Sequence, residues 1–244
     1  MSTDCPESSP EHKRLWHRIR QRFRRGVTRF NLIEDGDRIL VGLSGGKDSL
    51  VLLRLLAEQS RIWRPRFSVV AVHVENTTGQ YLTDKTYLEG YAASCGIPLL
   101  HASISVNPDP TGRKTTCFLC SWERRKALFR VAKEQNCNKI ALGHHRDDIL
   151  QTFLMNLVYE GNAGTMRPRM QMDRFAMTLI RPLCLVDECD LSRLAAEENF
   201  PAQLKRCPWE RETARTRMKI LLAQLEDINP EARQSLWRAC IGGE

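Results

Sequence analysis

The sequence predicts an α/β fold in which a doubly wound parallel sheet carries helices on both faces. Short apolar runs alternate with helical patterns between residues 38 and 159, as βα units do. A glycine-rich loop joins the first apolar run to the helix that follows it, at the place where such sheets bind ligands. With 244 residues, 42% of them hydrophobic, the chain is long enough to bury one sizeable core.

The elements begin with an amphipathic helix over residues 11–31, in which Leu15, Ile19 and Phe23 recur at helical spacing. Strands are predicted at 38–43, 67–74, 97–104 and 139–142. Helices are predicted at 50–59, 82–95, 118–136, 147–159 and 187–199. An extended run to 183 and a helical C-terminus are the last elements. We divide the chain into three parts: a basic N-terminal helical segment (1–31), an α/β domain (32–183) and a helical extension (184–244).

Positive charge is concentrated in the first helix. The chain has 37 Lys and Arg against 29 Asp and Glu, a net charge of +8, and residues 12–33 contain no acidic residue. The basic residues there are Lys13, Arg14, Arg18, Arg20, Arg22, Arg24, Arg25 and Arg29. This pattern favours RNA as the partner, with a solvated face or a membrane-surface helix as the alternatives.

The N-terminus shows no signal peptide and no long apolar span, so we expect a cytoplasmic protein without a membrane partner. Nine cysteines at irregular spacing then predict reduced thiols and raise the question of a metal site. The oligomeric state is left open, a homodimer being one option.

The loop Ser44-Gly45-Gly46-Lys47-Asp48-Ser49 is a candidate phosphate-binding loop, because backbone N–H groups at a helix N-terminus attract anions. A Walker A loop would need Gly at Val41 and Ser or Thr at Asp48. The Asp48 carboxylate beside a phosphate calls for a bridging cation, which predicts Mg²⁺. An ordinary capped turn is the alternative. The pattern resembles the PP-loop of the adenine-nucleotide alpha hydrolases, which implies transfer of AMP from ATP.

A Cys-x-x-Cys pair at Cys117 and Cys120 can hold one metal, and redox, zinc and iron–sulfur uses remain open. Cys207 is a candidate third thiolate for a [4Fe-4S] cluster, whereas a zinc site would need a fourth ligand such as His144 or His145. The other cysteines are interpreted as core or incidental: Cys5, Cys95, Cys137, Cys184, Cys189 and Cys240.

A second acidic motif, Gly143-His144-His145-Arg146-Asp147-Asp148, follows the strand at 139–142. A purely structural reading has Asp147 capping the next helix and Asp148 favouring its dipole. We expect Asp147 to lie near ATP or Mg²⁺ and leave Asp148 undecided between the two readings.

Four ordered segments now resemble the tRNA 2-thiocytidine synthetase (TtcA) family over about residues 13–210: Phe30 to Ile39, Ser44 to Ser49, Lys114 to Ser121 with Arg124 and Arg125, and Lys139 to Thr152. Ile180-Arg181-Pro182-Leu183 continues the match. The resemblance implies a Rossmann-like PP-loop (HUP-type) fold and ATP-dependent replacement of a cytidine C2 oxygen by sulfur, at anticodon-loop position 32 of tRNA. It also implies a [4Fe-4S] cluster on Cys117, Cys120 and Cys207, and a cysteine desulfurase as sulfur donor.

The resulting hypothesis assigns catalysis to Lys47, Asp48 and Asp147, and places adenine near His73, Val74 and Gly143. The expected tRNA contacts are Arg18, Arg22, Arg25, Arg124 and Arg125. Cys207 lacks a second nearby cysteine and the chain is short after Leu222, two departures that bear on the tRNA target. The alternatives are thiolation at another tRNA position, lysidine-type ligation, or a non-catalytic RNA-binding or iron–sulfur protein on the same fold.

Overall fold

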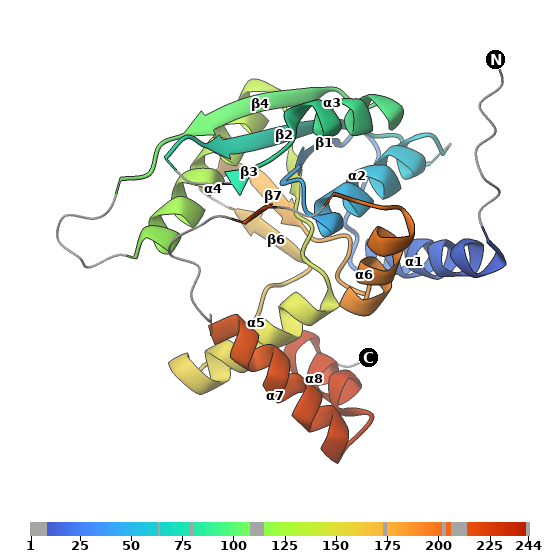
Figure 1. Cartoon of the computed structure of the whole chain (residues 1–244), viewed down its shortest axis with the longest axis vertical. Helices are drawn as coiled ribbons and strands as arrows, with labels where there is room; N and C mark the ends of the chain where they lie inside the picture. Colours follow the sequence, from blue (N-terminus) through green and yellow to red (C-terminus); the bar gives the residue numbers. More distant parts are fainter. Residues whose placement is uncertain are drawn as a thin grey trace.

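The computed structural model describes residues 9–62, 64–78, 81–107, 115–172, 175–201, 204–205 and 214–242. Within them a six-stranded sheet has the order β4-β2-β1-β5-β7-β6. Its strands are β1 (Arg38–Gly42), β2 (Ser68–Asn76), β4 (Leu99–Ile104), β5 (Lys139–Ala141), β6 (Arg169–Met172) and β7 (Met177–Ile180). Only β6 runs antiparallel to its neighbour among these described strands. The predicted doubly wound α/β fold is confirmed (Figure 1).

The helices of the described chain are α1 (Pro10–Arg29), α2 (Lys47–Ser60), α3 (Lys85–Ser94), α4 (Thr116–Glu134), α5 (Arg146–Glu160), α6 (Glu188–Glu197), α7 (Ala214–Ile228) and α8 (Ala232–Ile241). A separate ribbon pairs β3 (Tyr81–Leu82) antiparallel with β8 (Leu204–Lys205). The sequence pattern did not predict this ribbon or β6, because two to four residues carry too little periodicity to mark a strand.

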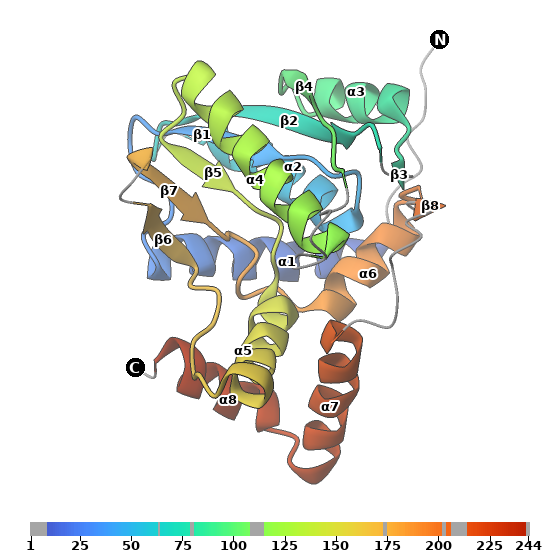
Figure 2. The same cartoon turned by 90° about the vertical axis from the view of Figure 1, so that its left-hand side faces the viewer.

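Two apolar clusters cover the two faces of the sheet. Side chains alternate along a strand, so Ile39 and Val41 of β1 face the cluster formed with α1, α2, α3 and α6. Leu40 faces the opposite cluster, formed with α4. Figure 2 shows α4 on one side of the sheet and α1 and α2 on the other. A parallel sheet requires this double cover, which explains the near-continuous apolar runs of its strands.

Helix α1 is part of the main core. Its side chains Leu15, Ile19 and Phe23 are almost fully buried, and Trp16 lies beneath the guanidinium groups of Arg20 and Arg54. The apolar face of this helix therefore packs against the rest of the protein. It is not available for contact with a membrane, which argues against the alternative of a membrane-surface helix. Among the described helices, none has the length and apolar character that crossing a bilayer requires.

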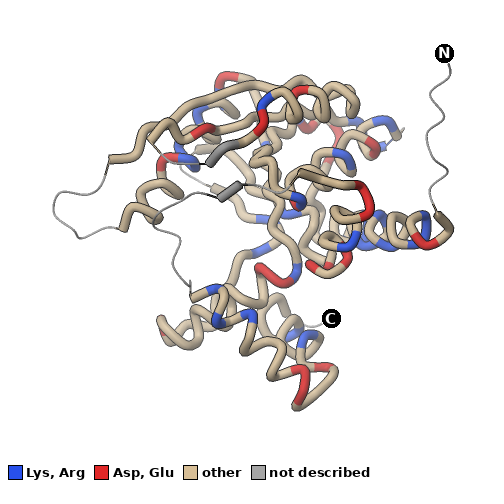
Figure 3. Tube along the Cα trace, in the orientation of Figure 1, with Lys and Arg blue, Asp and Glu red and all other residues tan. Residues whose placement is uncertain are grey.

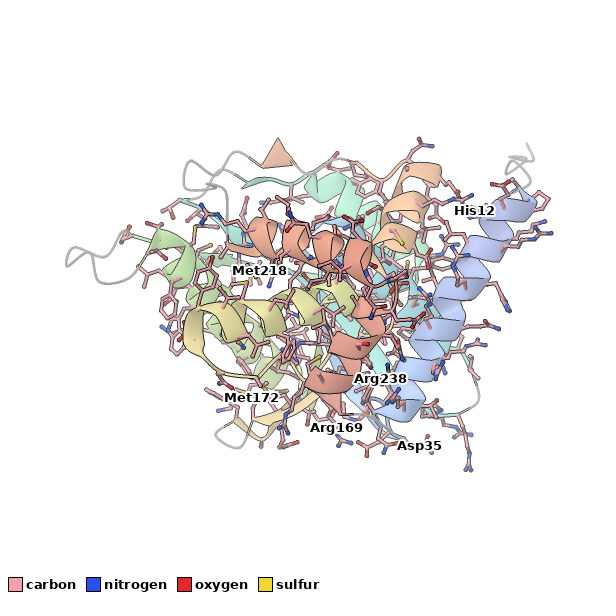
Figure 4. All side chains as sticks on the ribbon, turned by 90° about the horizontal axis from the view of Figure 1, so that it is seen from below. His12, Asp35, Arg169, Met172, Met218 and Arg238 are labelled. Carbon is pink, nitrogen blue, oxygen red and sulfur yellow. The ribbon has the colours of Figure 1, made fainter. Side chains whose placement is uncertain are left out.

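Helices α5, α7 and α8 form a further layer beyond the sheet edge, seen below the sheet in Figure 2. Met218 and Leu222 of α7 and Trp237 of α8 pack on Ile149 and Leu150 of α5. Figure 4 views this layer from below, with Met218 labelled on α7. The layer fixes α5, whose first turn begins directly after β5, and so fixes part of the site described next.

Candidate active site

The phosphate loop follows β1 and leads straight into α2, which begins at Lys47 and not at the predicted residue 50. The Ser49 hydroxyl donates to the Gly46 carbonyl at 2.8 Å, and the Ser44 hydroxyl donates to Ser49 at 3.1 Å. Gly45 adopts a φ of +85°, which an L side chain rarely adopts. Among the described residues no side chain caps the N-terminus of α2, whose helix dipole favours an anion. The serine hydroxyls hold the loop in shape by also accepting the N–H groups of Ser44 and Gly46.

A cavity of about 570 Å³ opens over this loop. The predicted nucleotide-binding residues in its wall are Ser44, Gly46, Asp48, Ser49, His73, Val74 and Gly143. Gly45 and Lys47 belong to the loop without forming part of that wall. Lys47 instead places its ammonium nitrogen 3.0 Å from the Asp48 carboxylate. The loop thus gathers the cation, the carboxylate and the hydroxyls predicted for it.

Two of these residues are explained by their packing. A Cβ on Gly143 would lie 3.2 Å from the carbonyl carbon of Asp48 and 3.2 Å from the nitrogen of Ser49, so glycine lets the loop after β5 touch the start of α2. His73 is buried, and its Nδ1 lies 2.8 Å from the Leu43 carbonyl oxygen. Burial lowers the pKa of His73, so the imidazole is neutral and donates this hydrogen bond.

The second acidic motif is placed differently from the prediction. Asp147 turns away from the cavity: it accepts the Glu188 N–H at 2.8 Å and pairs with Arg233 of α8. Those two contacts hold the pKa of Asp147 below its usual value against the opposing effect of burial. The described geometry therefore does not place Asp147 in the wall of this cavity, because its buried carboxylate is held by α6 and α8 instead.

Asp148, in contrast, lines the cavity over the phosphate loop. Its carboxylate accepts the N–H of His145 at 3.1 Å, completing a capping box at the start of α5. It also accepts from Arg215 of α7 at 3.1 Å. Asp148 thus has the capping role of the structural reading, and its position in the cavity wall leaves a role in chemistry as a proposal.

The cysteine pair lies on the first turns of α4, where Cys117 and Cys120 line a neighbouring cavity of about 670 Å³. The Asn76 amide lies 3.6 Å from the Cys120 sulfur. Below the thiols the wall is largely apolar and consists of Leu128, Phe129, Ile140, Leu142, Met166, Met170, Met172 and Leu179. Three guanidinium groups, those of Arg124, Arg125 and Arg181, complete it. The wall of this cavity is therefore mainly apolar, with three cationic side chains.

Arg181 stands out in this wall because it is only 5% exposed. Its Nη1 donates to the Arg167 carbonyl at 2.5 Å, but its Nε has no hydrogen-bond partner among the described residues. Desolvation lowers the pKa of Arg181. A buried cation that has no carboxylate partner in the described part of the chain is costly, so an anionic or oxygen-bearing ligand in this cavity would stabilise it.

The two cavities share one wall. It is formed by Asn76, Arg124, Leu128, Leu142, His144 and Arg215. Burial lowers the pKa of His144 to about 4, so this imidazole between the cavities is neutral, and its Nδ1 has no partner in the described chain. Sequence reasoning considered His144 only as a zinc ligand and did not find Arg215 or Asn76, which reach the site from α7 and β2.

The structure describes only some of the residues that were expected to bind a metal. Within the described residues, no three His, Cys, Asp or Glu side chains converge to hold a metal, so His144 or His145 does not complete a zinc site with the cysteine pair there. Cys207 lies outside the described residues, as does Cys5. Arg215, eight positions along from Cys207, lines the same cavity as Cys117 and Cys120. The donors present, two thiols on one helix face in a cavity that three arginines also line, fit an anionic thiolate-bound cluster.

The predicted tRNA contacts on α1 divide into two groups. Arg18 and Arg22 are paired with carboxylates of α6 and its cap: Arg18 with Asp190 at 2.6 Å, and Arg22 with Asp187. Arg25 is exposed on the same helix. Figure 3 shows the basic stretch along α1 with acidic residues close to it at α6. Part of the charge that predicted RNA binding is therefore used inside the protein.

Comparison with known proteins now defines the class. A model of the PP-loop domain matches residues 17–210, and the chain belongs to the PP-loop family. A tRNA-cytidine(32) 2-sulfurtransferase of Syntrophotalea carbinolica is 36% identical over 227 residues, covering 91% of this chain and 88% of the relative. That of Sorangium cellulosum is 40% identical over 220 residues, covering 88% and 77%. Within its class the chain thus belongs to the tRNA-cytidine 2-sulfurtransferase family and is a tRNA sulfurtransferase, as the resemblance of its motifs implied.

A solved structure with the same architecture is the U34-tRNA thiolase NcsA from Methanococcus maripaludis with its [4Fe-4S] cluster. It superposes with a TM-score of 0.75 at 25% sequence identity and covers 93% of this chain and 78% of that one. The likeness extends beyond the sheet, since it covers nearly the whole chain.

Proposed function

We propose that this protein thiolates a tRNA cytidine, with ATP bound in the cavity over the phosphate loop and the base presented from the cysteine-lined cavity. The adjacency of the two cavities carries the proposal. Activation of an oxygen and its replacement by sulfur take place at one carbon atom, so both reagents must reach that atom. The two cavities share a wall of six residues, so a base held at that wall would be next to both.

In the first step the cytidine O2 attacks the α-phosphorus of ATP, the bond to the β-phosphate oxygen breaks, and pyrophosphate leaves. The Ser44–Ser49 loop would hold the phosphates, and Asp48 would hold Mg²⁺ against the departing pyrophosphate. Lys47, paired with Asp48 at 3.0 Å, would exchange that contact for a phosphate when ATP binds. Asp148 is better placed than Asp147 to act beside the nucleotide, since only Asp148 lines the cavity.

In the second step sulfur attacks C2 and AMP leaves with the former base oxygen. A [4Fe-4S] cluster on Cys117, Cys120 and Cys207 would supply an open iron that carries the incoming sulfur. The relatives' name supports cytidine 32 as the target, and the cluster of NcsA supports the cofactor. Arg181 would face the oxygen or phosphate of the bound nucleotide, which balances its buried charge. A cysteine desulfurase is the proposed sulfur source, together with a thiol reductant that supplies the two electrons by which persulfide sulfur reaches the sulfide level.

The cysteine set tests the cofactor half of this proposal. Protein purified without oxygen should contain about four irons per chain and lose them on Cys117→Ala, Cys120→Ala or Cys207→Ala. Cys137→Ala is the matched control, because this buried thiol packs behind α4 and lines neither cavity. Zinc in place of iron, or full iron content in Cys207→Ala, would refute the proposed ligand set.

A further inference from the structure

Two large aromatic side chains are exposed beside the cysteine pair. Phe118 and Trp122 on α4 are 49% and 48% exposed, although such side chains usually contribute their surface to a core or an interface. Their rings are nearly parallel, with an interplanar angle of 12° and centroids 6.4 Å apart. Spaced four residues apart, they lie on one face of the helix and present stacked ring surfaces to the outside.

The position of this pair ties it to the active site. Phe118 directly follows Cys117, and Trp122 lies two residues beyond Cys120, whereas the thiols themselves line the cavity. The aromatic face lies beside the cavity wall on α4, because Arg125, three residues after Trp122, belongs to that wall.

Two cationic side chains of α4 lie near Trp122 in the sequence of the helix. The Lys126 ammonium lies 5.7 Å from the centre of the Trp122 ring while pairing with Glu123 at 2.8 Å. Arg125 lies on the neighbouring face of the helix and lines the cavity. Aromatic rings flanked by Lys and Arg are the combination with which proteins hold single-stranded RNA, since rings stack on bases and cations contact phosphates.

We propose that Phe118 and Trp122 form a stacking platform for an unpaired tRNA base next to the base that enters the cysteine-lined cavity. This inference rests on the proposed function, because it takes tRNA as the substrate. A single-stranded loop is the occupant, since paired bases have no free ring face to offer. The platform holds the neighbouring base beside the cavity, which separates the target base from its stacked neighbour.

The test compares RNA affinities of full-length variants prepared without oxygen. A fluorescent anticodon stem-loop is titrated with wild type, Trp122→Ala and Trp122→Phe, at several salt concentrations. Loss of one stacked base should raise the Kd about fivefold or more for Trp122→Ala, with most of the affinity restored in Trp122→Phe. The salt slope should stay unchanged, because no phosphate contact is removed. Equal thermal midpoints and iron contents would show that the variants are intact.

Tyr159→Ala is the matched control, because Tyr159 is also about half exposed (52%) but lies at the end of α5 and lines neither cavity. It should bind like wild type. Wild-type RNA affinity in Trp122→Ala would refute the stacking platform but not the proposed tRNA thiolation. It would point to a protein partner at this aromatic face. Failure of wild type to bind the stem-loop overturns the proposed function and the platform with it.

Discussion

Gly143→Ala tests whether the close contact between the loop after β5 and the phosphate loop sets the geometry of ATP. The added Cβ would meet two backbone atoms at 3.2 Å, the Asp48 carbonyl carbon and the Ser49 nitrogen. Neither can rotate away as a side chain would, so the start of α2 or the loop must shift by a few tenths of an ångström. Overpacking of this kind costs about 1–3 kcal/mol in the free energy of unfolding.

The functional effect should exceed what that loss of stability would cause. A misplacement of about 1 Å costs roughly a hundredfold in rate, so a few tenths predict about a tenfold fall in kcat/KM for ATP. The measurement is tRNA-dependent release of pyrophosphate, together with ATP affinity by calorimetry and urea unfolding. Gly143→Ala with wild-type turnover and ATP affinity would refute the account of this contact.

Gly90→Ala is its control. Gly90 lies within α3, a Cβ added there would meet no atom within 4 Å, and its φ is not positive. Alanine should therefore raise stability by about 0.5–1 kcal/mol through helix propensity alone and leave turnover unchanged.

Three further predictions address charge. Asp48→Asn should fold normally and lose about a hundredfold in pyrophosphate release, because the carboxylate proposed to hold Mg²⁺ is gone; unchanged turnover would contradict that role. Burial lowers the pKa of His144 from 6.5 to about 4. Between pH 4 and pH 6.5 the unfolded chain therefore binds a proton at this histidine that the folded protein does not bind. The free energy of unfolding should then rise with pH from about 4 to 6.5. Urea unfolding of His144→Gln should show a shallower rise, and an identical profile would contradict it. Arg25→Gln should lower the salt slope of tRNA binding by about one, and equal slopes in Arg25→Gln and wild type would contradict the RNA contact. Arg18→Gln should leave the slope unchanged and cost no more than about 1 kcal/mol of stability, because Arg18 is partly exposed and Asp190 keeps Arg22 as a partner.

The sequence was informative where function depends on local pattern. The glycine loop sits between a buried strand and a helix in the sequence itself, so its place at the sheet edge followed from the fold class. Cys117 and Cys120 share a helix face because they are three residues apart. Gly143 was assigned to the nucleotide, and the structure adds the reason for glycine there, which is its contact with the start of α2.

The other features of the site depend on contacts between residues far apart in the sequence. Asp147 and Asp148 are adjacent and chemically alike. Contacts with α6 and α8 hold the first in the protein interior, whereas the second pairs with α7 at the cavity. Arg215 reaches Asp148 across 67 residues of sequence. The pairing of Arg18 with Asp190 spans 172 residues. No local periodicity encodes such partners. The division into three parts stays a prediction, and α1 shares its core with the α/β domain.

The central claim is that AMP carries away the oxygen that sulfur replaces. It can be measured with a tRNA stem-loop whose target cytidine bears ¹⁸O at C2, incubated without oxygen with the intact enzyme, ATP, a sulfide source and Mg²⁺. Mass spectrometry should find one ¹⁸O in each AMP, pyrophosphate in equal amount, and one 2-thiocytidine per AMP released. Unlabelled AMP beside 2-thiocytidine would show that the base oxygen leaves by another route and would contradict the adenylation mechanism.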